Sequence, residues 1–406
     1  MSDWQEVKLR ECISTLKGFA FKSKWYQPNG VPIVRVSDFT DNSISVDDIE
    51  YIPHDLAQEH SRYLLKTKDV IVQTVGSWQH NPVSIVGKVV NVPSNLNGAL
   101  LNQNAVKIIP NKTIDNNFLY YRLKDEHFKL HNLGCAQGAA NQASITLSSI
   151  GSFRFNLPPF PTQQKIAKIL SNHDDLIENN LKRIKLLEES ARLIYEEWFL
   201  RFRIDGKKLE IDPESSLPFG WELVELGDFL KFKKGKKADE IFEEKKDNLI
   251  KLLLLSGLGS GEYAYVEKAR HVIARRGDVL MTMDGARSSV VFYSEDGAVG
   301  STMSLVETGK LPKSYLYHFF KSTYEWLEIN NTGAAIPHAN KSFINKMKII
   351  HPGDEILTKW SKKMYHINDQ VFNLKDQNQL LKEARDILLP RLMTGMIDTD
   401  ELDIAV

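Results

Sequence analysis

The sequence predicts an α+β protein in which two mixed α/β globular segments are separated by a long antiparallel two-helix coiled coil. Two stretches of coiled-coil periodicity, a pseudo-twofold internal repeat and short strand-like runs in both globular segments are the observations behind this prediction. The predicted globular segments cover residues 1–157 and 204–350, and the predicted long helices lie within 158–203 and 351–406.

The first helix is predicted from apolar residues that recur every three or four positions. This spacing is the roughly 3.5-residue period of a coiled-coil seam. Pro158, Pro159 and Pro161 interrupt helix before the seam, and Thr162 is a candidate cap. A helix of this length, about 50 Å at about 1.5 Å per residue, needs a partner to cover its apolar face. The seam consists of Ile166, Leu170, His173, Ile177, Asn180, Ile184, Leu187, Ala191, Ile194 and Trp198.

The second helix repeats the same seam near the C-terminus. The sequence LLKEARDIL at 380–388 aligns with LLEESARLI at 186–194, which indicates an internal repeat about half the chain long. The second seam consists of Trp360, Met364, Ile367, Val371, Leu374, Asn378, Leu381, Arg385, Leu388 and Leu392.

The chain order makes the two helices antiparallel, because the second must run back along the first. A dyad at the middle of the seam sets Asn180 opposite Asn378 and His173 opposite Arg385. Such polar layers cost stability but can fix the register of a coiled coil. The alternative is that Asn180 and His173 are merely tolerated near solvent. The same register pairs Ile166 with Leu392 and Trp198 with Trp360.

The globular segments show alternating or continuous apolar runs between turn signals. In the first segment the runs are VPIVRV at 31–36, DVIVQTV at 69–75, VSIVGKVV at 83–90 and AVKIIP at 105–110, followed by a helical stretch at 117–125. Parts of this pattern recur in the second segment: GDVLMT matches KDVIVQT, and YLYHFF matches FLYYRL. The sequence therefore predicts one α+β scaffold used twice with different surfaces.

Length and composition describe an ordinary globular protein of two or three domains. The chain has 406 residues, 42% of them hydrophobic. Two cysteines, Cys12 and Cys135, exclude a disulfide scaffold or a cysteine-based metal cluster and favour a reducing cytoplasm. Lys plus Arg and Asp plus Glu number 52 each, so the net charge gives no support to nucleic-acid binding. Any DNA contact must come from local patches.

The overall plan and four stretches resemble the specificity subunit of type I restriction-modification systems. The stretches are LPPFPTQQKIAKIL at 157–170, ARLIYEEWFLRFR at 191–203, SLPFGWELVELGDF at 216–229 and LLPRLMTGMIDTDEL at 388–402. The resemblance implies two target-recognition domains, each of which reads one half of a bipartite, asymmetric DNA site. It also implies that the helices act as spacer and as docking surface for two methyltransferase subunits. The sequence before the second helix, IIHPGDEIL at 349–357, departs from the usual proline-pair and glutamine-rich entry.

We expect no catalytic site and no metal in this chain. Asn156 to Phe160 reads NLPPF, and the inserted Leu157 separates it from the Asn-Pro-Pro-Phe loop of amino-methyltransferases. No GxxxxGK[ST] sequence is present. The resemblance assigns S-adenosylmethionine, ATP and Mg to partner subunits, which are the methyltransferase subunits and the restriction and translocation subunits. The alternative function is a two-module scaffold that binds proteins without reading DNA sequence.

Two lysine-rich loops occupy matching places in the repeat and are candidates for contacts with DNA phosphates. The first basic loop, LKGFAFKSKWY at 16–26, and the second basic loop, KFKKGKK at 231–237, each contain a glycine. The alternative is a solvated loop, partly neutralised in the second segment by Glu243 and Glu244. The candidates are Lys17, Lys22, Lys24 and Trp25 in the first loop, and Lys233, Lys234, Lys236 and Lys237 in the second.

Loops that follow equivalent strands are candidates for reading bases, because amide and guanidinium groups form paired hydrogen bonds with base edges. The loops differ between the two segments, as two separate sequence preferences require. The candidates are Ser77, Gln79, His80, Asn81, Gln137, Asn141 and Gln142 in the first segment, and Asp284, Arg287, Ser288, His338, Asn340 and Lys341 in the second.

Overall fold

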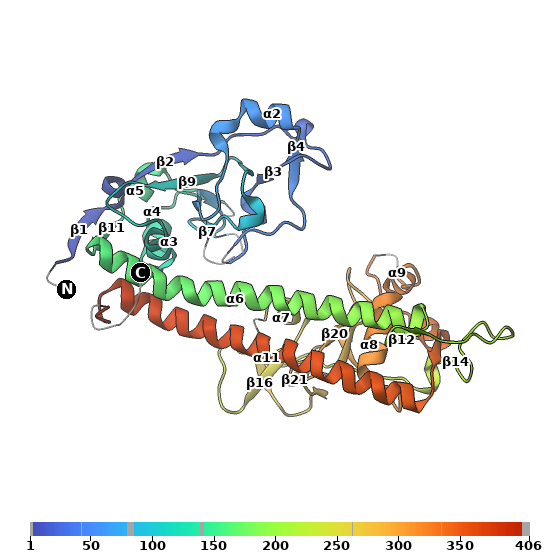
Figure 1. Ribbon diagram of the computed structural model, residues 1–406. Helices are drawn as coiled ribbons and strands as arrows, with labels where there is room; N and C mark the ends of the chain where they lie inside the picture. The colour runs from blue at the N-terminus through green and yellow to red at the C-terminus, as the bar shows by residue number, and fades with distance from the viewer. Residues whose placement is uncertain are drawn as a thin grey trace. The chain divides into compact units, whose positions relative to one another are not determined.

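The computed structural model describes residues 3–41, 43–78, 85–138, 142–261, 263–333 and 335–399 (Figure 1). The chain divides into two compact units. Unit 1 contains Met1–Asn179 and Gln377–Val406, and unit 2 contains Asn180–Asp376. Each unit therefore holds one α+β globular segment and a part of each long helix. None of the helices formed by the described residues has the apolar stretch that a membrane crossing needs.

Unit 1 is built on two small sheets. One has the strand order β2-β9-β5-β7 and is antiparallel, and the other has the order β4-β3-β8, with β3 and β8 parallel. All four residues of β5 are buried, as its continuous apolar run predicts. The strands are β1 (Gln5–Lys8), β2 (Ile13–Lys17), β3 (Val31–Val34), β4 (Glu50–Ile52), β5 (Val70–Gln73), β6 (Val75–Gly76), β7 (Val89–Asn91), β8 (Leu100–Leu101), β9 (Ala105–Pro110), β10 (Ala143–Ser144) and β11 (Arg154–Leu157).

Two consecutive helices cover the larger sheet of unit 1 and are started by aspartates. Asp115 accepts hydrogen bonds from two backbone N–H groups at the start of α3, and Asp125 accepts one at the start of α4. Most of α3 is buried, because it lies between the sheet and the long helices. The helices are α1 (Leu9–Cys12), α2 (His54–Glu59), α3 (Asn116–Lys124), α4 (Glu126–Cys135) and α5 (Leu147–Gly151).

Helix α6 (Phe160–Tyr195) is continuous and begins earlier than the sequence predicts. Pro161 lies in its first turn, where the missing N–H group has no intrahelical acceptor to lose. Thr162 is therefore inside the helix and does not cap it. The helix ends in a π-helical turn, Glu196–Leu200, whose extra residue lets the consecutive Trp198 and Phe199 both point into the core.

Helix α11 (Asp354–Met393) carries the second seam. None of the predicted seam residues on either helix is exposed, so the periodicity located the buried faces correctly. In unit 1 the start of α6 and the end of α11 share one cluster, which includes Ile166, Leu170, Leu392 and Met393. In unit 2 the π-helical turn that follows α6 packs on the start of α11, with the rings of Trp198 and Trp360 5.9 Å apart.

A partly buried ion pair joins the two long helices in unit 1, and a tyrosine of the globular segment bonds to it. Arg385 of α11 donates to Oδ1 of Asp174 on α6 at 2.6 Å, and the Tyr121 hydroxyl of α3 donates to Oδ2 of the same carboxylate at 2.6 Å. Burial and the neighbouring Asp174 charge raise the pKa of Tyr121. Arg385 also donates to the neighbouring Asp386 carboxylate at 2.8 Å, and Asp174, its partner on α6, is next in the chain to His173, the residue predicted to lie opposite Arg385. The ring of His173 is bonded to the Ile169 carbonyl at 2.8 Å.

Unit 2 contains two four-stranded sheets. Its antiparallel sheet is β15-β22-β19-β20, and its mixed sheet is β17-β16-β21-β18, with β16 and β21 parallel. The strands are β12 (Arg203–Ile204), β13 (Lys207–Lys208), β14 (Glu222–Glu225), β15 (Lys231–Lys234), β16 (Leu249–Leu253), β17 (Tyr265–Glu267), β18 (Ile273–Ala274), β19 (Val279–Thr282), β20 (Val291–Tyr293), β21 (Gly297–Val299), β22 (Met303–Glu307) and β23 (Lys348–His351).

Aromatic side chains form the centre of unit 2. Tyr195 and Trp198 of α6, Trp360 of α11 and His318 of α8 are buried together, with the His318 ring 5.6 Å from that of Trp360. His318 thus contacts both long helices in unit 2, as Tyr121 contacts α6 in unit 1. The remaining helices are α7 (Leu255–Ser260), α8 (Lys313–Ser322), α9 (Tyr324–Ile329) and α10 (Lys341–Lys346).

The buried histidine predicts a pH dependence of folding stability. Burial, and less strongly the Lys321 charge, lowers the pKa of His318 to about 4. The unfolded chain binds a proton at this residue below its ordinary pKa of about 6.5, whereas the folded chain does so only near 4. This group should therefore lower the free energy of unfolding by about 2 kcal/mol between pH 7 and pH 5.

The variant His318→Phe isolates this contribution, which urea denaturation followed by circular dichroism would measure at both pH values. We expect the variant to lose about 2 kcal/mol less than the wild type over this pH interval. Equal losses in both proteins would show that His318 is not held neutral in the folded chain.

Candidate nucleic-acid interface

A glycine lets each of the two basic loops pack directly against a backbone carbonyl of its own unit. A Cβ atom on Gly18 would lie 1.9 Å from the carbonyl oxygen of Asn102, and one on Gly235 would lie 2.2 Å from that of Gly300. Any side chain would therefore push the strand ends apart. The residue after each glycine forms an isolated β-bridge with the neighbouring segment: Phe19 pairs with Asn102, and Lys236 pairs with Gly300. The two loops thus occupy the same place in the same strand order.

The first basic loop is supported by a cluster of aromatic rings. Trp25 is half-buried, with its ring 6.5 Å from Phe19 and 6.0 Å from His60. The Lys22 ammonium lies 5.5 Å from the Trp25 ring centre. Trp25 therefore shapes the loop by packing, and His60 is a member of this cluster that sequence reasoning missed. The predicted Lys17, Lys22 and Lys24 are all exposed.

The second basic loop begins as a strand rather than as the predicted loop. Lys231–Lys234 form β15, so successive lysines point to opposite faces of the sheet. Lys233 is paired with Glu307 at 2.6 Å, and Lys234 with Asp284 at 3.3 Å. The side chains of Lys236 and Lys237 are exposed, and neither has a hydrogen-bond or ion-pair partner in the part of the chain that the structure describes.

In unit 2 the two loops predicted to read bases lie together with the end of β15. Asp284 follows β19, His338 follows α9, and Lys234 ends β15. The Asp284 carboxylate lies 2.8 Å from Nδ1 of His338 and 3.3 Å from Nζ of Lys234. Burial, the largest influence, raises the pKa of Asp284, but hydrogen bonds from His338 and Lys234 outweigh it and hold the pKa below its usual value.

The other predicted residues of this region differ in their exposure. Arg287 is exposed, and no hydrogen bond or ion pair occupies its side chain among the described residues. Ser288 is 1% exposed, and its hydroxyl lies within hydrogen-bond distance of the carbonyls of Gly285 and Pro337, so its role is to hold the loop rather than to contact a ligand. Asn340 caps α10 through the Phe343 N–H group, and Lys341 lies over the ring of Phe232 at 5.7 Å.

The corresponding region of unit 1 is described only in part. Ser77 is buried, Gln137 is exposed and pairs with Ser144 through its backbone, and Gln142 is exposed. The predicted Gln79, His80, Asn81 and Asn141 lie outside the described residues. Within the described ranges, no group of three or more histidine, cysteine or acidic side chains is arranged to hold a metal ion.

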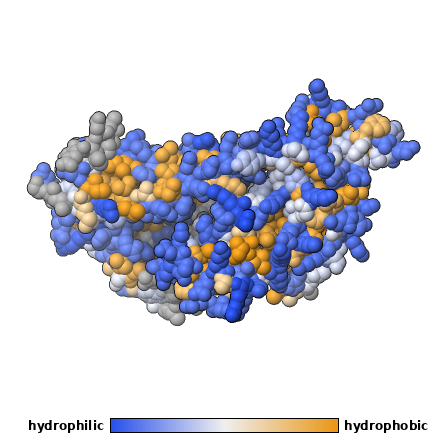
Figure 2. Space-filling model, turned by 90° about the horizontal axis from the view of Figure 1, so that it is seen from below, coloured by the Kyte–Doolittle hydropathy of each residue, from blue (hydrophilic) through white to orange (hydrophobic). Residues whose placement is uncertain are grey.

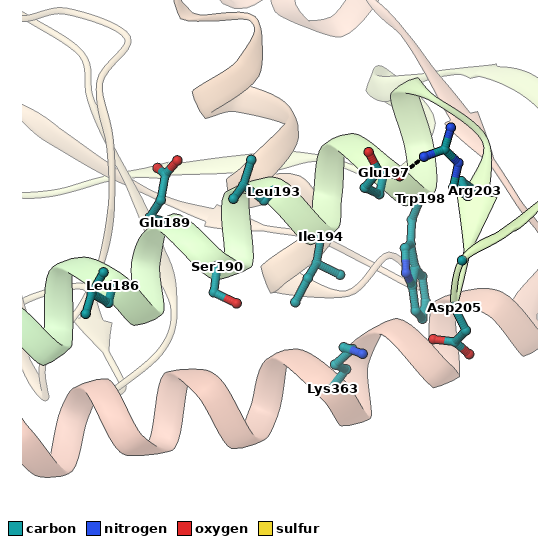
Figure 3. A pocket seen from close by; sticks show the side chains of 11 residues that line it. Leu186, Glu189, Ser190, Leu193, Ile194, Glu197, Trp198, Arg203, Asp205 and Lys363 are labelled. Atoms are coloured by element: carbon teal, nitrogen blue, oxygen red, sulfur yellow. Dashed lines mark ion pairs between the residues drawn. The ribbon is translucent and has the colours of Figure 1, made fainter.

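A groove of about 440 Å³ lies along α6 in unit 2 (Figure 3). The side chains of Leu186, Leu193, Ile194 and Trp198 form its apolar floor. Charged groups border it: Arg203 of the β12–β13 hairpin is paired with Glu197 at 3.2 Å, and Asp205 with Lys359 of α11 at 2.5 Å. Leu186 is 70% exposed. Figure 2 shows one face of the molecule, on which apolar side chains also reach the surface between charged ones.

Comparison with known proteins assigns this chain to a family. Residues 1–189 and 218–384 match the model of the type I restriction modification DNA specificity domain. The chain is 23% identical to the putative type I restriction enzyme MjaX specificity subunit of Methanocaldococcus jannaschii over 410 aligned residues, which cover 97% of this chain and 94% of that protein. It is 26% identical over 326 residues to the MjaIX specificity subunit of the same organism, covering 74% and 73% of the two chains.

A solved structure shares the fold. The type I restriction-modification S subunit of M. genitalium superposes with a TM-score of 0.56 at 16% identity, and 96% of each chain is covered. The family model covers most of the chain, in both of its halves. The chain therefore belongs to the family of type I restriction-modification DNA specificity proteins.

Proposed function

We propose that this chain is the DNA-specificity subunit of a type I restriction-modification complex, in which each globular segment reads one half of a bipartite, asymmetric DNA site. The observation that carries the proposal is that each unit has a basic loop with a closely packed glycine. The loop follows the same edge strand of the antiparallel sheet in both units. Around this loop the exposed polar side chains differ. Two globular segments with the same strand order but different exposed side chains suit a DNA site whose two halves have unrelated sequences.

The exposed lysines of the two loops supply the phosphate contacts in this proposal. Lys17, Lys22 and Lys24 in unit 1 and Lys236 and Lys237 in unit 2 give local positive charge in a chain whose net charge is zero. Phosphate contacts orient a protein on the duplex and carry no sequence information, whereas base edges specify. Base contacts then belong to Arg287 and His338 in unit 2 and to the loops around Gln137 and Gln142 in unit 1.

The long helices act as spacer and docking surface. We infer that they form one antiparallel coiled coil with a pseudo-twofold repeat, in which Asn180 faces Asn378 as a polar layer that fixes the register. The groove along α6 has the features of a docking site for a partner helix, with an apolar floor and a charged border. The partners would be two methyltransferase subunits, joined by restriction and translocation subunits.

In this proposal the chain is not an enzyme. S-adenosylmethionine, ATP and Mg act on the partner subunits, and the complex works in the cytoplasm, where Cys12 and Cys135 stay reduced. The alternative, a two-module protein scaffold, would bind the same partners without selecting a DNA sequence. The repeated basic loops favour the DNA-reading function.

Methylation mapping tests the function directly. The chain would be co-expressed with a methyltransferase subunit encoded beside it, and modified bases would be located by single-molecule sequencing. We expect a bipartite motif with two unrelated halves and a fixed gap. Exchange of residues 1–157 for those of a relative should change one half only. A stable complex that leaves the DNA unmethylated would favour the protein scaffold instead.

Removal of two unpaired lysines should weaken DNA binding without changing the sequence preference. For Lys236→Ala with Lys237→Ala, we expect the slope of log affinity against log salt to fall by about 2, because two phosphate contacts are lost. Fluorescence anisotropy with cognate and non-cognate duplexes would measure both effects. Lys310→Ala with Lys321→Ala removes the same charge from exposed positions outside the loop and should leave the slope unchanged.

Cysteine crosslinking tests the coiled-coil register. In a Cys135→Ser background, Asn180→Cys with Asn378→Cys should form a disulfide on mild oxidation, because facing positions bring Cβ atoms within bonding reach. The matched control, Asn180→Cys with Leu381→Cys, shifts one partner by nearly a helical turn and should not crosslink. Preferential crosslinking of the control pair would overturn the centred register.

A further inference from the structure

The imidazole of His338 is held in place from several directions. The His338 backbone pairs with Thr332 through both its N–H and its C=O groups, at 2.7 and 2.9 Å. Gly333 packs so closely on the ring that a Cβ atom there would lie 2.9 Å from Cδ2 of His338. On the other side, Nδ1 meets the Asp284 carboxylate at 2.8 Å. The orientation of the ring is therefore set by the protein before any ligand arrives.

The hydrogen bond to Asp284 also decides which ring nitrogen carries the proton. An ionised carboxylate can only accept, so Nδ1 of His338 must be the donor. In the neutral imidazole Nε2 is then an acceptor. The side chain is 49% exposed, and Nε2 has no hydrogen-bond partner among the residues that the structure describes. The region thus presents a fixed, outward acceptor.

Lys234 makes the Asp284 carboxylate compatible with a surface that would approach DNA. Its Nζ holds Oδ2 of Asp284, while Nδ1 of His338 holds Oδ1, so each carboxylate oxygen has its own donor. The lysine also offsets the negative charge that phosphates would repel. Asp284 is 28% exposed, less than either of its partners, and lies beneath them. This position suits support of the other two side chains rather than contact with a base.

The donors that DNA offers in the major groove are few. Only the exocyclic amino groups, N6 of adenine and N4 of cytosine, donate hydrogen bonds there, whereas guanine and thymine present acceptors at the equivalent places. We propose that His338 accepts a hydrogen bond from such an amino group at one base of the half-site read by unit 2, and that Asp284 is a positioning residue that keeps His338 in the tautomer able to do so. This inference rests on the proposed function.

Two variants separate the reading residue from the positioning residue. His338→Ala removes the acceptor, and preference for adenine or cytosine at one position of one half-site should fall about tenfold. Asp284→Asn lets the amide donate to Nδ1, so that Nε2 can carry the proton and become a donor. This variant should admit guanine or thymine at that same position. The readout is the methylated motif of the complete complex with its methyltransferase subunits.

A neighbouring variant supplies the control. Glu307→Gln breaks the ion pair to Lys233, the residue beside Lys234, and leaves Asp284 and His338 untouched. We expect its motif to match that of the wild type at every position. If His338→Ala and Asp284→Asn also keep the wild-type motif, the inference is wrong while the proposed function stands. If the wild-type complex yields no bipartite motif, the proposed function fails, and the inference fails with it.

The tautomer can be measured without DNA. In protein labelled with ¹⁵N only in histidine, two-bond ¹⁵N–¹H correlation spectra distinguish the Nδ1–H and Nε2–H forms. The His338 signals are assigned by their loss in His338→Ala. We expect the Nδ1–H form in the wild type at pH 8 and an increased share of the Nε2–H form in Asp284→Asn. An Nε2–H form in the wild type would overturn the inference whatever the methylation result.

Discussion

Burial of the apolar faces of two long helices is the constraint on which the rest of this structure depends. Helix α6 has 36 residues and α11 has 40, and neither could remain solvated with its apolar face uncovered. In each unit a cluster of buried side chains contains residues of both helices and of the globular segment, and in unit 2 a further small cluster of Ile184, Val371 and Leu374 lies between the helices. The globular segments are therefore not loosely tethered domains, because their cores are continuous with the helices that carry them.

In the two units the globular segment contacts the long helices through different chemistry. In unit 1 Tyr121 and Arg385 both donate to the partly buried Asp174 carboxylate, one to each oxygen. In unit 2 His318 of α8 packs neutral among aromatic rings of the long helices. A polar network specifies one geometry strongly, whereas an aromatic cluster gains most from buried area. The contacts between globular segment and long helices thus differ in chemistry between the two units.

The candidate interface shows how far residue types alone can lead. Lysine density and glycine placement identified both basic loops, and the structure shows why the glycines are needed: a neighbouring backbone carbonyl lies where a Cβ atom would be. The same reasoning misjudged Ser288, which looks like a polar loop residue in the sequence but is buried. It also treated Asp284, His338 and Lys234 as separate candidates. Their connection depends on bridges between segments about 50 residues apart, which leave no periodic signal.

The sequence by itself determined the features that repeat locally. The buried face of each long helix, the strands β3, β5 and β9 and the helix α3 were predicted because apolar spacing and turn residues act over a few neighbouring positions. Only the tertiary structure decided which polar groups meet. The ion pair between Arg385 and Asp174, and the use of one carboxylate to hold both His338 and Lys234, depend on side-chain directions where distant segments approach each other. Those directions are set by packing of the whole unit, and the spacing of residues along the chain does not encode them.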